Sequence, residues 1–430
     1  MPVSAQRGEI LHLTGNPAQD GDAVVQHFED GILLIEDGIV VSCGASQDLL
    51  RGLSPDCEIE HHANGLIVPG FIDTHVHFPQ VEVMAAYGTQ LLDWLETYTF
   101  PAEGKFSDPQ YASEIAEFFL DQLLANGTTT ALVFGTVHPQ SVEAFFTAAE
   151  KRQLRMVCGK VLMDRNAPDY LCDTPERAYN ESKDLIKRWH NKNRLGYAVT
   201  PRFAPTSSDA QLAQAGLLLK EFPDVHLHTH LAENHDECKW VSELFPDNRS
   251  YLDVYQHHGL LGRRSVFAHS IHIDDQDWQQ LSKHQSGIAH CPMSNLSIGS
   301  GLFDYKSALR NNVNVGLGTD IGGGDSFSIL RTVNEAYKIQ QLQGFNLSPL
   351  ESLYLSTLGG AKTLDLDSHI GNFETGKEAD FVVLDCAATP LIDFRIKFCK
   401  SLQEKLFVLQ MLGDDRVIRQ TRILGKLVGN

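Results

Sequence analysis

The chain lacks the sequence features of several large protein classes. Its eight cysteines include no Cys-x-x-Cys pair, which disfavours a thiolate zinc site, a redox pair and a zinc fold of the cytidine deaminase type. No apolar run approaches the roughly 18 residues needed to cross a bilayer, and the first ten residues hold no apolar core of a signal peptide. Scattered cysteines without a leader predict free thiols in a reducing, cytoplasmic setting.

Positive charge is also scarce. The sequence has 35 Lys and Arg against 55 Asp and Glu, a net charge of −20. This balance disfavours nucleic acid and anionic membrane as partners. The hydrophobic content of 42% is that of an ordinary globular protein, and no repeat or low-complexity segment is evident.

Both ends of the chain are rich in short strands. Residues 31–41 hold two apolar runs joined by Glu36-Asp37-Gly38, a pattern typical of a β-hairpin. Near the other end, residues 379–384 and 422–428 predict further strands. We therefore expect one small β-sandwich domain built from both termini, residues 1–68 together with 373–430.

The middle of the chain, residues 69–372, alternates helix and strand. Asp108 and Pro109 predict the start of a helix, and Gly127 predicts its end. Residues 128–134 are then apolar and β-branched without alternation, as in a strand buried on both faces. Similar strands are expected at 157–163, 197–200, 225–231, 265–269, 287–290 and 313–318. With the strand that leads into His75 there are eight, which predicts an α/β fold of the (β/α)8 TIM barrel type.

The most informative motif is Pro69-Gly70-Phe71-Ile72-Asp73-Thr74-His75-Val76-His77. Histidines at spacing i, i+2 on a strand share one face, with Cα atoms about 7 Å apart. Two neutral imidazoles placed in this way can bind one divalent metal ion. Two surface histidines would show the same spacing, so the pair gains weight only from matching residues downstream.

Those residues follow later strands of the predicted barrel. His230, His269 and Asp320 each stand at or just after the carboxyl end of a strand. Because the carboxyl ends of barrel strands open into one mouth, the three can meet His75 and His77 there. Three imidazoles and a carboxylate suit Zn²⁺ or Fe²⁺ better than Mg²⁺ or Ca²⁺. Such an ion lowers the pKa of a bound water toward about 7.

Several neighbouring residues admit two interpretations. Glu233, three residues after His230, can carry protons at the metal water, or it can be an acid in the first turn of a helix. Asp320 can equally cap a helix. His228 can contact a substrate, bond to a metal ligand, or be a buried histidine of the core, and His290 is similarly ambiguous.

Taken together, these motifs resemble the amidohydrolase superfamily of mononuclear metal-dependent deaminases. The resemblance covers nearly the whole chain, and no lysine stands where a carboxylated bridging ligand would be evident, consistent with one metal ion. Within the superfamily the chain resembles the guanine deaminases. The segments that carry this closer resemblance are residues 77–80, 91–95, 98–101, 163–168 and 200–206.

The resemblance implies an activity and a set of site residues. The implied reaction is the hydrolysis of guanine to xanthine and ammonia, in purine catabolism or salvage, by a homodimer. The implied metal ligands are His75, His77, His230 and Asp320, with zinc favoured and Fe²⁺ the alternative. The implied catalytic residues are Glu233 and Asp320 for proton transfer, with His269 as an outer ligand or a donor to the nucleophile. The implied substrate contacts are Gln80, Arg202, Phe203 and His228.

The chemistry of three of these residues agrees with a purine lactam as substrate. Arg202 can hold the C6 carbonyl through paired donors, Gln80 has both a donor and an acceptor, and Phe203 offers a flat face. Each residue also has a plainer interpretation: Arg202 as a residue of a surface ion pair, Gln80 as a turn residue at a strand end, and Phe203 as part of the barrel core.

Two other functions stay open. One is a different enzyme of the superfamily acting on a related aminated heterocycle; a 6-aminopurine would give Arg202 no carbonyl. The other is a binding protein without catalysis, which the complete ligand set disfavours.

Overall fold

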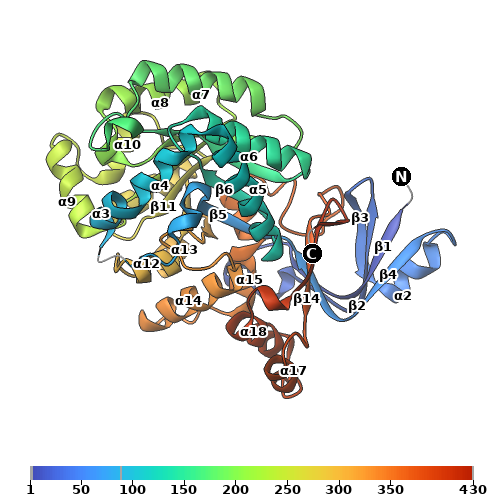
Figure 1. Cartoon of the computed structure of the whole chain (residues 1–430). Coiled ribbons are helices and arrows are strands. Elements are labelled where there is room, and N and C mark those ends of the chain that lie inside the picture. Colours follow the sequence, from blue (N-terminus) through green and yellow to red (C-terminus); the bar gives the residue numbers. More distant parts are fainter. Residues whose placement is uncertain (1–2, 88–89, 429–430) are drawn as a thin grey trace.

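The computed structural model describes residues 3–87 and 90–428. Figure 1 shows a barrel with helices on its outside and, beside it, a separate sheet that contains strands from both ends of the chain. The predicted (β/α)8 barrel and its companion β domain are confirmed. The eight parallel barrel strands are β5 (Phe71–His77), β6 (Thr128–Phe134), β7 (Arg155–Gly159), β9 (Gly196–Pro201), β10 (His226–Leu231), β11 (Ser265–His269), β12 (Gly287–His290) and β13 (Val315–Leu317).

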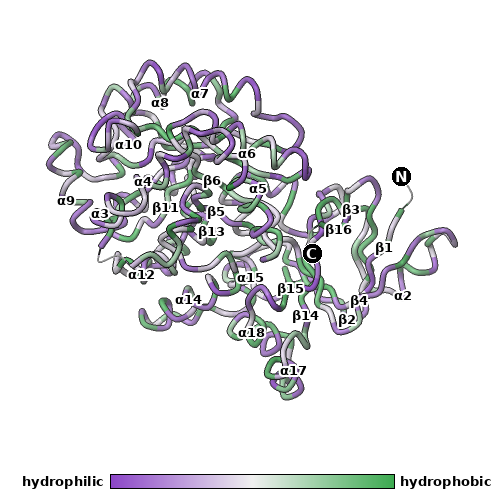
Figure 2. Tube along the Cα trace, in the orientation of Figure 1, coloured by the Kyte–Doolittle hydropathy of each residue, from purple (hydrophilic) through white to green (hydrophobic). Residues whose placement is uncertain are grey.

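Helices connect successive strands around the barrel. Before the last strand they are α3 (Leu91–Trp94), α4 (Phe100–Gly104), α5 (Pro109–Ala125), α6 (Pro139–Lys151), α7 (Pro175–Trp189), α8 (Asp209–Glu221), α9 (His235–Leu244), α10 (Tyr251–His257), α11 (Asp275–His284), α12 (Pro292–Ser297) and α13 (Tyr305–Arg310). After it come α14 (Ile329–Leu342), α15 (Pro349–Ser356) and α16 (Leu358–Thr363). In Figure 2 hydrophilic residues colour the outer helices α7 and α8, as expected of elements that expose one face to solvent.

Contacts between the first and last strands bring the barrel mouth together. Thr74 Oγ1 donates to the Leu317 carbonyl at 2.9 Å. Beyond the strands, the Asp320 amide donates to the His75 carbonyl at 2.9 Å. These bonds fix the loop after β13 against the end of β5, so that Asp320 stands beside the two histidines of that strand.

The start and the end that the sequence predicts for helix α5 are confirmed. The side chain of Asp108 caps α5 by accepting from the Gln110 amide at 2.9 Å, and Pro109 is the first helical residue. Gly127 has φ +79°, the left-handed conformation that favours glycine after a helix.

The predicted strand 157–163 is wrong in its extent, because it is two strands. β7 ends at Gly159, and β8 (Val161–Leu162) pairs with β9 on its own. A Cβ atom at Gly159 would lie 1.9 Å from the Ala198 carbonyl oxygen. The neighbouring strand therefore approaches as closely as it does only because residue 159 is glycine, and the strand is interrupted at Lys160.

In the described part of the chain, the sheet beside the barrel has seven strands, drawn from the N-terminal and C-terminal regions. They are β1 (Ser4–Leu13), β2 (Val25–Glu36), β3 (Ile39–Ala45), β4 (Glu58–Pro69), β14 (Phe381–Asp385), β15 (Ile418–Ile423) and β16 (Lys426–Val428). The predicted hairpin is β2 and β3, and its turn residues Asp37 and Gly38 have φ of +52° and +83°. Helices α17 (Pro390–Ile396) and α18 (Leu402–Leu412) lie between β14 and β15 in the chain.

The chain passes from this sheet into the barrel at Gly70, between β4 and β5. The Gly70 amide donates to the Asp380 carbonyl at 3.0 Å, and the next amide, of Phe71, donates to the Gly127 carbonyl at 3.0 Å. Strand β4 of the seven-stranded sheet and strand β5 of the barrel are thus separated by a single residue, Gly70. Among the described residues no helix is long and apolar enough to cross a membrane.

Candidate active site

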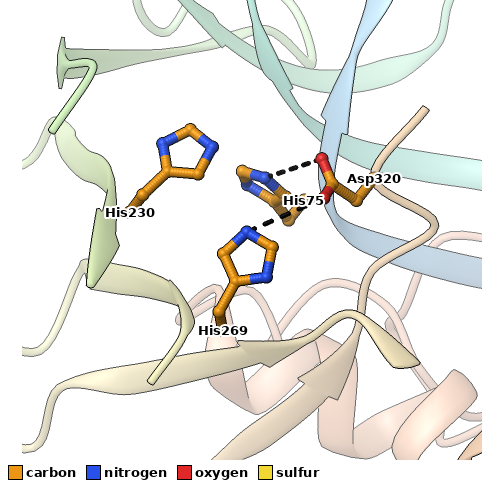
Figure 3. A group of neighbouring side chains, drawn as sticks. All are labelled: His75, His230, His269 and Asp320. Carbon is orange, nitrogen blue, oxygen red and sulfur yellow. Dashed lines mark ion pairs between the residues drawn. The ribbon is translucent and has the colours of Figure 1, made fainter. Parts of the chain in front are cut away.

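The candidate metal ligands meet at the mouth of the barrel. His75 and His77 come from β5, His230 from β10 and His269 from β11, and Asp320 lies three residues beyond β13. Figure 3 shows His75, His230, His269 and Asp320 turned toward a common point, and their ligand atoms all lie within 4.8 Å of one another. The side chains that the sequence places on four different strands are therefore neighbours in space.

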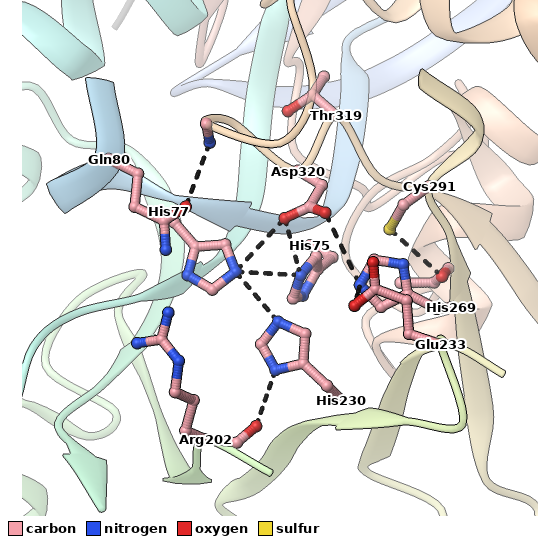
Figure 4. A network of polar contacts seen from close by, with 12 residues as sticks. His75, His77, Gln80, Arg202, His230, Glu233, His269, Cys291, Thr319 and Asp320 are labelled. Atoms are coloured by element: carbon pink, nitrogen blue, oxygen red, sulfur yellow. Dashed lines mark hydrogen bonds and ion pairs between the residues drawn. The ribbon is translucent and has the colours of Figure 1, made fainter. Parts of the chain in front are cut away.

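His77 belongs to the same cluster. Its Nε2 lies 3.2 Å from Nε2 of His75 and 3.2 Å from Nε2 of His230. Asp320 Oδ1 lies 3.2 Å from His75 Nε2 and 3.4 Å from His77 Nε2 (Figure 4). Each of the four ligands assigned by family resemblance, His75, His77, His230 and Asp320, therefore has a ligand atom within 3.4 Å of another of the four.

The hydrogen bonds of the imidazoles leave nitrogen lone pairs directed at that point. His230 donates from Nδ1 to the Arg202 carbonyl at 2.7 Å, and His269 donates from Nδ1 to Asn295 Oδ1 at 2.8 Å. In each ring the other nitrogen, Nε2, then carries a lone pair. His269 Nε2 is buried and has no hydrogen-bond partner in the described chain.

The protonation of the cluster also suits a metal ion. Burial lowers the pKa of His77 to about 3, so the ring is neutral near pH 7. Neutral rings with Nε2 atoms 3.2 Å apart cannot all satisfy one another, because a lone pair accepts a bond and cannot donate one. A divalent cation at their centre satisfies them together, and three or four imidazoles with a carboxylate are donors that Zn²⁺ and Fe²⁺ accept.

Glu233 lies beside this cluster rather than in a helix. It precedes Asn234, the N-cap of α9, so it is not an acid of the first turn. Its backbone amide donates to Glu237 Oε2 at 2.9 Å, and its Oε1 accepts from Ser300 Oγ at 3.0 Å. The other oxygen, Oε2, is 3.4 Å from His269 Nε2.

The environment of Glu233 favours its protonated form. Burial, together with the charge of Asp320, raises the pKa of Glu233 to about 8. A cation bound nearby would lower that pKa again. The carboxyl is therefore poised to hold or release a proton near neutral pH, as a general acid or base requires.

Asp320 caps no helix, since α14 begins only at Ile329.

A pocket opens directly onto these groups. It is lined in part by His77, His230, Glu233 and Asp320. The other residues that line it are Gln80, Leu91, Trp94, Leu95, Arg202, Phe203, Ile298 and Gly323. Three of the four predicted substrate contacts, Gln80, Arg202 and Phe203, are thus on the wall of the pocket that holds the candidate ligands.

His228, the fourth, is not on that wall. It is fully buried beneath the cluster, with Nε2 2.7 Å from His75 Nδ1. Of the interpretations open from the sequence, the position fits a hydrogen-bond partner that orients a metal ligand. His290 is buried against Phe303, with ring centroids 4.7 Å apart, and is also absent from the pocket wall.

Sequence reasoning missed two partners that hold the site in place. Glu103 is fully buried and bonds to both Arg202 and Gln80. Asn295, in α12, orients His269. Neither residue stands at a spacing that points to the site; for Glu103 the one available signal is a carboxylate directly after the apolar Phe100-Pro101-Ala102.

Comparisons with known proteins agree with this geometry. The model of the amidohydrolase family matches residues 66–428. A guanine deaminase of Escherichia coli (strain K12) is 53% identical over 429 residues, which cover 99% of this chain and 98% of that protein. The guanine deaminase of Homo sapiens is 35% identical over 385 residues, 86% of this chain and 84% of that protein.

Two solved structures show the same fold. The structure of E. coli guanine deaminase has a TM-score of 0.96 at 51% identity, covering 100% of this chain and 99% of the other. The structure of guanine deaminase from C. acetobutylicum with bound guanine in the active site has a TM-score of 0.89 at 28% identity, covering 99% and 100%.

Proposed function

The chain belongs to the amidohydrolase family, and from this membership and the pocket at its barrel mouth we propose that it hydrolyses guanine to xanthine and ammonia. One observation carries the proposal. A single pocket is lined by His77, His230 and Asp320 and also by Arg202 and Gln80. Groups able to hold an ion that activates water and groups able to hold a purine lactam therefore line the same pocket.

The proposed cofactor is one divalent ion, with Zn²⁺ favoured by the donor set and Fe²⁺ the alternative. His75, His77, His230 and Asp320 would hold it, and His269 stands close enough to act as a further ligand or a hydrogen-bond partner. When bound, such an ion supplies acidification of water, so that hydroxide is available near neutral pH.

Arg202, Gln80 and Phe203 are proposed to orient the base. The Arg202 guanidinium donates to the C6 carbonyl oxygen of guanine. Gln80, whose amide is both donor and acceptor, meets the neighbouring lactam edge. Phe203 packs against the flat ring. This places the C2 carbon, which carries the amino group, toward the histidines.

Proton transfer is proposed for two residues. Glu233 delivers a proton to ring nitrogen N3 as water adds to C2, consistent with its raised pKa. Asp320 takes a proton from the water and passes it to the departing amine, and Glu233 takes back the proton that the C2 hydroxyl loses as the C2 carbonyl of xanthine forms. His269 helps to hold the attacking water. Water adds, the C2–N bond breaks, and ammonia leaves, so no oxidant or second substrate is needed.

We further propose that the enzyme acts in the cytoplasm, in purine catabolism or salvage, as a homodimer. All eight cysteines are free thiols, which suits a reducing compartment. The expectation of a homodimer rests on the family resemblance, and sedimentation of the purified protein measures it.

The activity is tested by following the ultraviolet spectrum of guanine with metal-replete protein, with adenine as the matched control. The proposal predicts conversion of guanine to xanthine with release of ammonia, and no reaction of adenine, which has no carbonyl for Arg202. An unchanged guanine spectrum with metal still bound would contradict it and leave another aminated heterocycle as substrate.

A further inference from the structure

Glu103 lies behind the wall of the pocket and is fully buried. It belongs to α4 (Phe100–Gly104), which continues α3 (Leu91–Trp94) and the π-helical turn η4 (Leu95–Thr99). The start of this helical segment contributes Leu91, Trp94 and Leu95 to the pocket. A carboxylate without exposure to solvent is costly unless it is paired and hydrogen-bonded, so its partners indicate its role.

Those partners are the two residues proposed to recognise the lactam. Arg202 Nη1 donates to both carboxylate oxygens of Glu103, at 2.8 Å each, and Gln80 Nε2 donates to Oε1 at 3.1 Å. Arg202 and Gln80 are themselves 3% and 2% exposed. The carboxylate thus joins a residue that follows β9 to one that follows β5.

This contact determines which atoms are left for a ligand. Glu103 engages Nη1 of Arg202, so Nη2 and Nε remain as donors. The Phe100 ring, in the same short helix, lies 5.6 Å from Arg202 Cζ, so α4 holds the guanidinium through two side chains. The side-chain nitrogen of Gln80 donates to Glu103. The side-chain oxygen of Gln80 therefore points away from Glu103, and it accepts from the backbone amide of Gly322 at 3.4 Å.

The contact also sets the charge of this side of the pocket. Arg202 carries +1 and Glu103 carries −1, and both are buried. The pair therefore offers hydrogen-bond donors without a net positive charge. A neutral lactam can use those donors, whereas an anionic purine gains no net Coulomb attraction from the pair.

We propose that Glu103 is a positioning and specificity residue: it aligns Arg202 and Gln80 for a neutral lactam, and it cancels the charge that would otherwise retain an anionic product. The inference rests on the proposed deamination of guanine. Xanthine is a weak acid that loses a ring proton just above neutral pH, so the product, unlike guanine, becomes an anion in that range. Cancelling the charge of Arg202 thus favours release of product.

The test compares steady-state kinetics of the metal-replete wild-type enzyme with Glu103→Gln, an exchange of nearly equal size. KM for guanine should rise about tenfold to 100-fold, the usual effect of losing a charged hydrogen bond, with a smaller change in kcat. His77, His230, Glu233 and Asp320 line the same pocket in both proteins, so their titration acts on both alike. Relative to the wild type, inhibition of E103Q by xanthine should become stronger as pH rises through neutrality. Glu103→Asp, which keeps the charge, should restore the wild-type direction of that pH trend.

A matched control is Glu82→Gln, which changes a carboxylate in the same region of the chain. Glu82 bonds to Lys105 at 2.7 Å, is exposed, and does not line the pocket. Its KM and its xanthine inhibition should stay at the wild-type values.

The outcomes separate the inference from the function on which it rests. If the wild type deaminates guanine but E103Q matches it in KM and in the pH trend of xanthine inhibition, the inference is overturned and the function stands. If E103Q raises KM but binds xanthine more weakly at every pH, Glu103 serves packing alone and the specificity role is overturned. If metal-replete wild type leaves guanine unchanged, function and inference fall together.

Discussion

The main-chain carbonyl of Arg202 accepts a hydrogen bond from Nδ1 of His230 at 2.7 Å, while the side chain of the same arginine lines the pocket. The carbonyl is an acceptor only, so the proton is on Nδ1 and Nε2 of His230 is free to bind a metal ion. One residue therefore fixes a candidate ligand through its backbone and faces the substrate through its guanidinium. Changes to its side chain should separate the two roles.

Replacing Arg202 by Met should weaken guanine binding and leave metal binding intact. We expect kcat/KM for guanine to fall about 10- to 100-fold, because a charged donor to the C6 carbonyl is lost. Metal content, measured by atomic emission on the purified variant, should remain at the wild-type value because the carbonyl at position 202 is unchanged. Loss of the metal ion from this variant would contradict the separation of roles. It would show that the bond between the Arg202 side chain and Glu103 is needed to hold the Arg202 carbonyl, and with it His230, in place.

Replacing Glu233 by Gln should abolish turnover without removing the metal ion. General acid or base catalysis contributes about 10²- to 10⁴-fold, so kcat should fall by that factor while guanine still binds. The amide keeps an oxygen for the Ser300 hydroxyl, which bonds to Glu233 at 3.0 Å, so the local structure should persist. Near-normal kcat in this variant would exclude Glu233 from the proton path.

The sequence predicted those features of the fold and site that depend on local pattern. The i, i+2 histidines of β5, the cap at Asp108 and the turn at Gly38 each depend on residues within a few positions, and the structure has them where the pattern placed them. The meeting of metal ligands from separate strands could also be predicted, because the carboxyl ends of all strands in such a barrel open into one mouth.

Partners set by packing between distant segments could not be predicted. Glu103 meets Arg202 across 99 residues, and the position of His228 beneath His75 depends on how two strands face each other in the barrel. Where β7 ends, Gly159 lies against the backbone of Ala198, a contact that no pattern around residue 159 reveals.

Stability should fall in mild acid partly through His12, which is outside the active site. Burial lowers the pKa of His12 to about 4, with Glu374 and Lys377 acting in opposite directions. In the unfolded chain a histidine has a pKa of about 6.5. Between these values the unfolded chain binds a proton that the folded one does not, so stability declines as pH falls from about 6.5 to 4 and is unaffected above.

The measurement is urea unfolding of wild type and His12→Gln across that range. One proton corresponds to a slope of about 1.4 kcal/mol per pH unit, and the variant should lack up to that much of the wild-type slope. Other titrating groups, including the site histidines, act equally in both proteins. Parallel curves for the two proteins would show that His12 takes up its proton in the folded state.

Gly70→Ala should destabilise the junction between β4 and β5. An added Cβ would lie 2.1 Å from Thr129 Oγ1 and 2.5 Å from its Cγ2, so the strand must shift. Such overpacking costs about 1–3 kcal/mol, measured by urea unfolding. The control is Gly52→Ala, where nothing lies within 4 Å of the added Cβ. Equal stability of the two variants would mean that the junction relaxes without cost.

The most direct test of the account is a titration of metal-stripped protein with Zn²⁺ while guanine turnover is recorded. One site formed by His75, His77, His230 and Asp320 predicts activity that rises from near zero and reaches a plateau at one equivalent of metal per chain. Full activity of the stripped protein, or a plateau only at two equivalents, would contradict a single-metal site at the mouth of this barrel.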